Sequence, residues 1–221
     1  MSEQALIPKM KRVDKSKKKF VIPWLNIALI VFFTLLIISS TFLNINLKHY
    51  IIPLNLFSSE KLTNNDFIYS MYFIPQIPTI MFVCSVLGKK MSITCTVLYI
   101  LLGLFALPIF ALGGGYKYIG EFGFGYTIGY IPAAIIIGNC LKTEYSFKNM
   151  IKSAILGGLT IHIFGIIYML SVALIKHTGG DFITGWICAQ SGLKILYDIV
   201  IGFIVILIGK YLHCGLKYIL E

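Results

Sequence analysis

The sequence predicts an all-α integral membrane protein, a compact bundle of six transmembrane helices with the N-terminus and the C-terminus in the cytoplasm. Three observations lead to this fold class. Hydrophobic residues make up 57% of the 221 residues and charged residues 13%, about half of the roughly 25% charged residues of a soluble domain. The apolar residues form runs long enough to cross a bilayer. The lysines gather in alternate gaps between these runs, as the positive-inside bias requires.

Residues 1–19 form a basic tail that precedes a six-helix membrane domain over residues 20–221. Seven cationic side chains cluster in the tail: Lys9, Lys11, Arg12, Lys15, Lys17, Lys18 and Lys19. Such a segment before a first membrane helix is a topology signal that also favours anionic headgroups. Because the net charge of +10 is concentrated in this way, it does not indicate a nucleic-acid partner.

The first three spans are predicted over about 22–44, 67–88 and 91–111. The first belongs to a run without charge over 20–47, which is too long for the apolar core of a signal peptide. The second contains Pro75 and Pro78, which remove two amide donors, so we expect an irregular first half. Irregular backbone at membrane depth must be buried in protein or line a cavity. The third span is followed by three glycines.

The last three spans are predicted over about 122–141, 153–175 and 191–209. The fourth is rich in glycine and aromatic residues, and the fifth is interrupted only by His162. The sixth carries Lys194 and Asp198 in its first turns.

The gaps between these spans set the orientation. With the N-terminus inside, the inner gaps hold Lys89, Lys90, Lys142, Lys148, Lys152, Lys210 and Lys217. The outer gaps hold Lys48, Lys61, Lys117 and Lys176 together with Glu60, Asp66, Glu121 and Asp181. Six spans satisfy the positive-inside bias at every gap, whereas five or seven do not.

Ionisable and polar groups inside the spans are candidate site residues, because the membrane makes them costly. Lys194 and Asp198 lie four residues apart on one helix face, so they could pair or contact a ligand in a cavity open to the outside. His162 could bond a neighbouring helix or touch a ligand. Gln76 could hydrogen-bond a small molecule, or it could satisfy backbone groups freed by a helix break.

The stretch 111–130 is rich in glycine and tyrosine. Gly114 and Gly115 permit a tight loop, while Tyr116 and Tyr126 supply aromatic faces. We interpret the stretch as an extracellular hairpin that closes over a pocket; an interfacial aromatic belt is the alternative for some of the tyrosines. No GxGxxG follows a strand and no GK[ST] is present, so a nucleotide loop is not indicated.

Catalysis, metal binding and cofactor binding are not indicated. We find no Ser/His/Asp or Cys/His arrangement and no HExxH motif, and the carboxylates are too sparse for a two-acid site. The five cysteines are scattered without a CxxC pair, which predicts neither a metal site nor a disulfide framework. Without a Walker motif, uphill transport would need another subunit or an ion gradient.

Residues 74–134 resemble the BioY family, the biotin-binding S components of energy-coupling-factor (ECF) vitamin transporters. The resemblance is carried by PQIP at 75–78, LG at 87–88, YILLGLFALPIFALGGG at 99–115 and FGYTIGYIPAA at 124–134. HIFGIIYM at 162–169 is also similar. The resemblance implies a six-helix fold with cytoplasmic ends, and biotin held near the outer face under the long first loop. It further implies partnership with a membrane coupling subunit and two cytoplasmic ATPases in the plasma membrane.

The last helix departs from the family pattern. Members commonly carry an Asp and a Lys three residues apart after a Pro-Gly, whereas this sequence reads AQSGLKILYD at 189–198. If Lys194 matches the lysine, Ser191 stands where the Asp is expected. Alternatively, Asp198 supplies the acid in a shifted arrangement.

For bound biotin, the predicted ligand-binding residues are Gln76, Tyr99, Gly114, Gly115, Tyr116, Tyr126, His162, Tyr168, Lys194 and Asp198. Lys194 is the first candidate for the ligand carboxylate and Lys117 the second. Three alternatives remain open: an S component for another vitamin, a membrane enzyme with His162 as base, and a structural subunit. The enzyme would need a second ionisable group near His162, and the span itself offers none.

Overall fold

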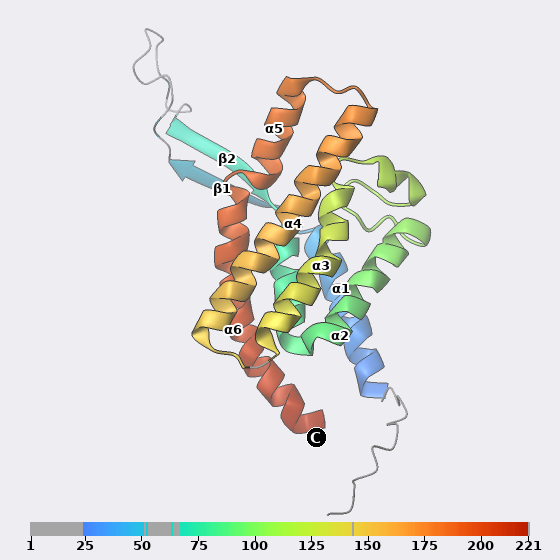
Figure 1. Cartoon of the computed structure of the whole chain (residues 1–221), viewed down its shortest axis with the longest axis vertical. Coiled ribbons are helices and arrows are strands. Elements are labelled where there is room, and N and C mark those ends of the chain that lie inside the picture. The colour runs from blue at the N-terminus through green and yellow to red at the C-terminus, as the bar shows by residue number, and fades with distance from the viewer. Residues whose placement is uncertain (1–23, 51, 53–62, 64–66, 143, 221) are drawn as a thin grey trace, which may run out of the picture.

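The computed structural model describes residues 24–50, 52, 63, 67–142 and 144–220, with side chains up to residue 215. Helices dominate this part of the chain (Figure 1). The elements, in order, are α1 (Trp24–Thr41), β1 (Ile45–Tyr50), β2 (Ile68–Phe73), α2 (Gln76–Phe105), the 3₁₀ helix η2 (Tyr116–Gly120), α3 (Phe124–Leu141), α4 (Phe147–Ile175), α5 (Gly180–Ser191) and α6 (Lys194–Leu220). The predicted basic tail and most of the long first loop lie outside the described residues.

Five stretches of the described chain are helical, long and apolar enough to cross a membrane. They are α1, α2, α3, α4 and the stretch Gly180–Gly215, which joins α5 to α6. The predicted class, a mainly helical protein with several membrane-length apolar helices, is therefore confirmed. α5 alone has 12 residues, about 18 Å of helix, which is shorter than a bilayer core of about 30 Å.

α2 consists of two arms that fold back on each other at Gly88. In a straight helix, Gln76 and Tyr99 would lie about 34 Å apart along the axis. Instead, Gln76 Nε2 donates a hydrogen bond of 2.7 Å to Tyr99 Oη. The reversal uses a backbone conformation of φ 71° and ψ 179° at Gly88, a region open almost only to glycine. The arms 76–87 and 89–105 correspond to the predicted second and third spans.

The predicted irregularity in the second span is wrong. Residues 68–73 form β2, which pairs antiparallel with β1 from Ile45↔Phe73 to Tyr50↔Ile68. The helix then begins at Gln76, with Pro75 at its N-cap and Pro78 in its first turn. At these positions a proline removes no intrahelical hydrogen bond, so both prolines fit the start of a helix without breaking it.

The ends of the later helices also differ from the prediction. α4 begins at Phe147, six residues early, because the Ser146 side chain caps it by accepting a hydrogen bond of 3.3 Å from the Asn149 amide. α5 was not predicted, and α6 begins at Lys194 and continues past the expected end near residue 209.

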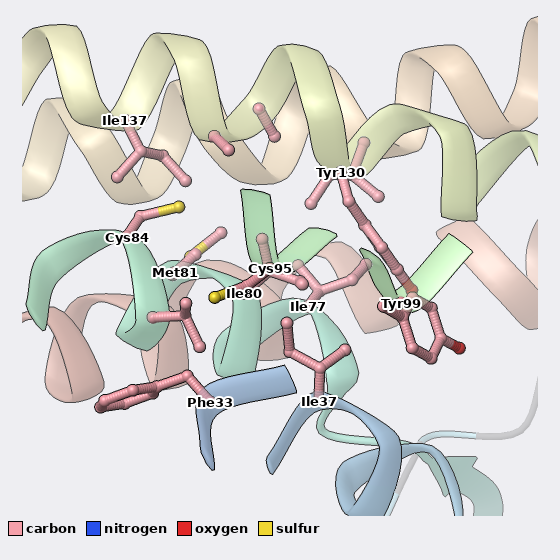
Figure 2. Close-up of a cluster of buried hydrophobic side chains, with 14 of the residues drawn as sticks. Phe33, Ile37, Ile77, Ile80, Met81, Cys84, Cys95, Tyr99, Tyr130 and Ile137 are labelled. Atoms are coloured by element: carbon pink, nitrogen blue, oxygen red, sulfur yellow. The ribbon is translucent and has the colours of Figure 1, made fainter. Parts of the chain in front are cut away.

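The core lies between α1, both arms of α2 and α3 (Figure 2). Phe33 and Ile37 of α1 meet buried side chains of α2, and Tyr130 and Ile137 of α3 close the opposite side. Cys84 and Cys95 are buried here as small apolar residues.

The two ends of the bundle differ in structure. At the upper end of Figure 1 lie the β1–β2 hairpin, α5 and the loops around η2. The reversal of α2, the α3–α4 connection and the end of α6 lie at the lower end. The upper end therefore gathers the irregular segments that can surround a ligand.

Candidate functional site

A cavity of about 410 Å³ lies among these upper segments, within the range of about 300–1,000 Å³ that is usual for small-molecule sites. Its aromatic lining consists of Tyr99, Tyr118, Tyr126, Tyr130 and Trp186. Its polar lining consists of Asn44, Gln76, Thr127, Gln190 and Lys194. Both arms of α2, α3, α5 and α6 contribute, so the fold must be complete before the cavity exists.

Gln76 is the centre of a buried hydrogen-bond network on one wall. Its Nε2 donates to Thr41 Oγ1 at 2.8 Å and to Tyr99 Oη at 2.7 Å. Its Oε1 accepts a hydrogen bond of 2.8 Å from Tyr130 Oη. Both amide hydrogens are used within the protein, and none of the three partners is a backbone group. Gln76 thus fixes the two tyrosines of the wall and has no amide hydrogen left for a ligand.

A second network leads from the cavity into the interior. Tyr126 Oη and Ser191 Oγ lie 2.5 Å apart. Ser191 Oγ is 2.9 Å from His162 Nδ1, and His162 Nε2 is 3.1 Å from Asp198 Oδ2. Ser191, His162 and Asp198 are 3%, 1% and 0% exposed. His162 and Asp198 therefore support the cavity wall from behind.

Of the two alternatives for Lys194 and Asp198, a salt bridge between them is not formed. Asp198 pairs with His162, and in the part of the chain that the structure describes no carboxylate lies within 4.0 Å of Lys194 Nζ. The reason is that Asp198 is fully buried against α4, whereas Lys194, one turn earlier, lines the cavity. Lys194 is left as a cation at the edge of an aromatic cavity.

The fold also corrects the expectation that no Ser/His/Asp arrangement exists. Ser191, His162 and Asp198 come from three helices and are connected like a catalytic triad. The span of His162 itself offers no second ionisable group, but α6 supplies Asp198 beside it. The serine hydroxyl, however, is buried and held between Tyr126 and His162. With no open face for a substrate, this arrangement supports the wall and does not form a nucleophile.

Three of the predicted residues belong to the loop beside the cavity. Gly115, with φ +86°, donates a backbone hydrogen bond of 2.8 Å to the Gly103 carbonyl. A Cβ on Gly114 would lie 2.6 Å from Pro108 Cα, so glycine allows the loop to pack on the end of α2. The Tyr116 side chain is 68% exposed. None of the three lines the cavity, and Lys117, the second candidate for a ligand carboxylate, is also exposed.

Tyr168 also acts through this loop. Its hydroxyl donates to the Ile119 carbonyl, and its ring packs edge-on against Phe124 with centroids 5.8 Å apart. The hydrogen bond to Ile119 holds η2 against α4. η2 in turn places Tyr118 in the cavity lining.

Several lining residues were not among the predicted ligand-binding residues. Tyr130 is four residues after Tyr126 in a glycine-rich helix, so helical spacing could have identified it. Trp186 and Gln190 share a face of α5 in the same way, but that helix was not foreseen. Burial raises the pKa of Tyr118 to about 12, with Tyr99 and Glu121 adding to the shift. Its phenol therefore stays protonated at neutral pH.

The family model described as "BioY family" matches residues 14–218 of the chain. A protein of Thermotoga maritima named "Biotin transporter BioY" is 37% identical over 93 residues, which are 41% of this chain and 51% of that protein. A protein of Lysinibacillus sphaericus named "Probable biotin transporter BioY" is 34% identical over 85 residues, 38% of this chain and 43% of that protein. The chain thus matches about half the length of these curated relatives.

One solved structure has a similar fold. It is entitled "Crystal structure at 2.1 A of the S-component for biotin from an ECF-type ABC transporter". It aligns with a TM-score of 0.59 and 20% identity over 85% of this chain and 89% of the other. Because the family model spans nearly the whole sequence, the chain belongs to the BioY family.

Proposed function

We propose that this protein is the high-affinity biotin-binding S component of an ECF transporter and captures biotin without covalent chemistry. The observation that carries the proposal is the composition of the cavity, whose aromatic and hydroxyl walls end at one cation, Lys194. Biotin combines a neutral bicyclic ureido ring with a carboxylate tail. Aromatic faces and a few polar groups suit the ring, and a cation suits the tail.

The state of Lys194 supports this reading. In a desolvated site a charge needs a partner, and within the described residues no protein carboxylate comes within 4.0 Å of its Nζ. A ligand carboxylate would supply the missing partner. The pair would be formed and desolvated together, which strengthens the charge-assisted hydrogen bond.

The orientation that fits this function has six spans, with both termini cytoplasmic and the cavity facing outward. The two arms of α2 serve as separate spans in this arrangement. Lys89 and Lys90 next to the Gly88 reversal then lie on the same side as Lys148 and Lys152 at the start of α4, in agreement with the positive-inside bias. The proposed partners are a membrane-embedded coupling subunit and two cytoplasmic ATPases, and the proposed location is the plasma membrane.

Biotin titration calorimetry on ligand-free protein, after mass spectrometry of any small molecule released from it, tests the proposal. We expect one biotin per chain with submicromolar affinity. Lys194→Gln should weaken binding by about ten- to a hundredfold, the value of a hydrogen bond to a charged group. Lys117→Gln is the matched control and should leave the affinity unchanged, because Lys117 is exposed and does not line the cavity.

The second candidate is an S component of the same fold for a different vitamin. It is favoured by Ser191, which stands where an acid is expected next to the site lysine. If properly folded protein binds no biotin and releases another small molecule, this candidate replaces the first. Equal affinities for the Lys194→Gln and Lys117→Gln variants would refute the assigned role of Lys194.

A further inference from the structure

The hydroxyl of Thr127 on α3 differs from those of the other helical threonines. In a helix, a threonine hydroxyl commonly donates to a carbonyl of the preceding turn. The described threonines that do so are Thr34, Thr41, Thr79, Thr94, Thr96, Thr160 and Thr184. Thr127 is the exception, because its Oγ1 has no hydrogen-bond partner among the described residues, although the side chain is only 5% exposed.

The free hydroxyl of Thr127 opens onto the cavity. Thr127 is one of the residues that line the cavity. Among the described residues, the fully enclosed side-chain polar atoms without a partner are His49 Nε2 and Asp198 Oδ1. Thr127 Oγ1 also lacks a partner but is not one of these enclosed atoms, so it borders free space. Because so little of the side chain is exposed, that space is the cavity that Thr127 lines.

The position of Thr127 around α3 explains why α4 supplies no partner. A Cβ on Gly125 or on Gly129 would lie against Tyr168 or Ile161 of α4, so these two glycines form the side of α3 that packs on α4. Thr127 is two residues from each glycine, and two residues correspond to about 200° around a helix with 3.6 residues per turn. Its side chain therefore leaves α3 on the side away from α4.

An unpaired hydroxyl at a buried wall is suited to a polar group of a ligand. Leaving a buried polar group without a hydrogen bond is unfavourable, so Thr127 gains from any partner that enters the cavity. A hydroxyl can both donate and accept a hydrogen bond. It therefore matches a neutral group that carries N–H and C=O side by side, as a ureido ring does.

The place of Thr127 in the cavity indicates which end of the ligand it meets. Tyr99 and Tyr130, which line the cavity with it, are 1% and 3% exposed, so this wall is buried. On the side formed by α5 and α6, Gln190 and Lys194 are partly exposed. A ligand with a neutral polar ring and a carboxylate tail then fits with its ring at the buried wall and its tail at the cation.

We propose that Thr127 contacts the ligand and determines specificity, by forming a hydrogen bond with the neutral polar ring while Lys194 holds the carboxylate. The inference rests on the proposed function, in which the ring is the ureido ring of biotin. A ligand without a hydrogen-bonding group at that end would leave the hydroxyl unpaired and would bind more weakly. Thr127 thus selects for polarity at the end of the ligand that Lys194 does not touch.

The test is calorimetric titration of the full-length protein with biotin and with biotinamide, in which a neutral amide replaces the carboxylate. Thr127→Val keeps the shape of the side chain and removes the hydroxyl, so it should weaken both ligands by the same factor, about tenfold. Lys194→Gln should weaken biotin and leave biotinamide nearly unchanged. Thr127→Ser restores the hydroxyl and should bind both ligands like the unsubstituted protein.

Thr96→Val is the matched control. Thr96 is also buried in a helix, but its hydroxyl bonds the Ile93 carbonyl and it lies outside the lining of the described cavity, so biotin affinity should not change. The unfolding temperature of the ligand-free protein separates a ligand contact from a structural role. Thr127→Val should not lower this temperature, because no hydrogen bond within the protein is lost.

Unchanged biotin affinity in Thr127→Val would overturn the inference, and so would a Thr127→Ser variant that binds as weakly as Thr127→Val. A lower unfolding temperature of ligand-free Thr127→Val would assign the hydroxyl a structural role instead. A loss of affinity for biotin that disappears with biotinamide would assign it to the carboxylate. If Thr127→Val does not fold, Thr127→Ala takes its place in the comparison with Thr127→Ser. Unsubstituted protein that binds no biotin contradicts the proposed function instead, so the two failures are distinct.

Discussion

At the scale of single residues, the polar side chains of the cavity are fixed by the protein before any ligand arrives. Gln76 illustrates this, because one amide joins α1, both arms of α2 and α3 through three hydroxyl groups. A polar network that is satisfied in this way holds its members in one geometry. Removing its centre would take one hydrogen-bond partner from each of three buried hydroxyl groups.

Gln76→Leu should therefore lower the free energy of unfolding by about 1–3 kcal/mol, the range for buried polar groups left unpaired. Thermal unfolding in detergent measures this, followed by maleimide labelling of the buried Cys84 and Cys95. Ser171→Ala is the control, since the Ser171 hydroxyl bonds only the preceding turn on an exposed face. Equal unfolding temperatures for the two variants would show that the network does not contribute to stability.

The sequence identified the site's side chains better than it identified their roles. Four of the predicted ligand-binding residues, Gln76, Tyr99, Tyr126 and Lys194, line the cavity. His162 and Asp198 lie directly behind the wall, where His162 contacts both Asp198 of α6 and Ser191 of α5. No spacing along the chain connects these three residues. Contacts between distant helices depend on packing, and a single sequence does not encode packing in a readable pattern.

At the scale of elements, glycines determine where the helices reverse and how closely they approach. Gly88 allows α2 to fold back on itself, and a Cβ there would meet nothing within 4 Å. Any effect of a substitution at Gly88 is therefore a backbone effect. The prolines of α2, by contrast, were predicted to break a helix and instead mark its start, since the sequence does not reveal which residue begins the first turn.

Gly88→Ala should destabilise the protein by about 1–3 kcal/mol, because alanine does not readily adopt φ 71° with ψ 179°. The measurement is the shift in unfolding temperature in detergent. Gly215→Ala is the matched control: that glycine also has open space around it but lies in α6, where alanine favours the helix. A stabilised Gly88→Ala variant would mean that the reversal tolerates a side chain.

Gly165 of α4 controls the position of Tyr126. A Cβ at this glycine would lie 2.5 Å from Cδ2 of the Tyr126 ring, so Gly165→Ala must displace the ring or separate α3 from α4. We expect biotin affinity to fall by about tenfold, as measured by calorimetry. Gly185→Ala, with no atom near its added Cβ, should bind biotin normally. Normal affinity in Gly165→Ala would show that the position of the Tyr126 ring does not affect ligand binding.

At the scale of the whole molecule, composition predicts the long apolar helices. It does not predict the shorter elements at the upper end of the bundle. Runs of apolar residues predict spans because a helix that crosses the lipid core needs about 20 predominantly apolar residues. The β1–β2 hairpin and α5 are short, of mixed polarity and stabilised by what they rest on, so the sequence alone did not reveal them. His49 of β1, for example, stacks on Tyr197 of α6 with ring centroids 5.2 Å apart, a contact between residues far apart in the chain.

Two native cysteines provide a test of the proposed orientation. Cys188 on α5 and Cys214 near the end of α6 are both exposed. α5 and the end of α6 lie toward opposite ends of the bundle (Figure 1). In intact cells an impermeant maleimide should label Cys188 in a Cys140→Ser, Cys214→Ser variant. In a Cys140→Ser, Cys188→Ser variant it should label Cys214 only after permeabilisation. The reverse pattern would place the cavity toward the cytoplasm.

The uncompensated charge of Lys194 has a consequence for the empty protein. A cation held against aromatic walls, with no carboxylate within 4.0 Å of it among the described residues, raises the free energy of the folded state. We expect an anionic ligand to remove this cost when it binds. Occupancy then adds stability as RT ln(1 + [L]/Kd). We therefore expect the ligand-free protein to unfold at a lower temperature than the ligand-bound protein, so the unfolding temperature would report occupancy of the cavity.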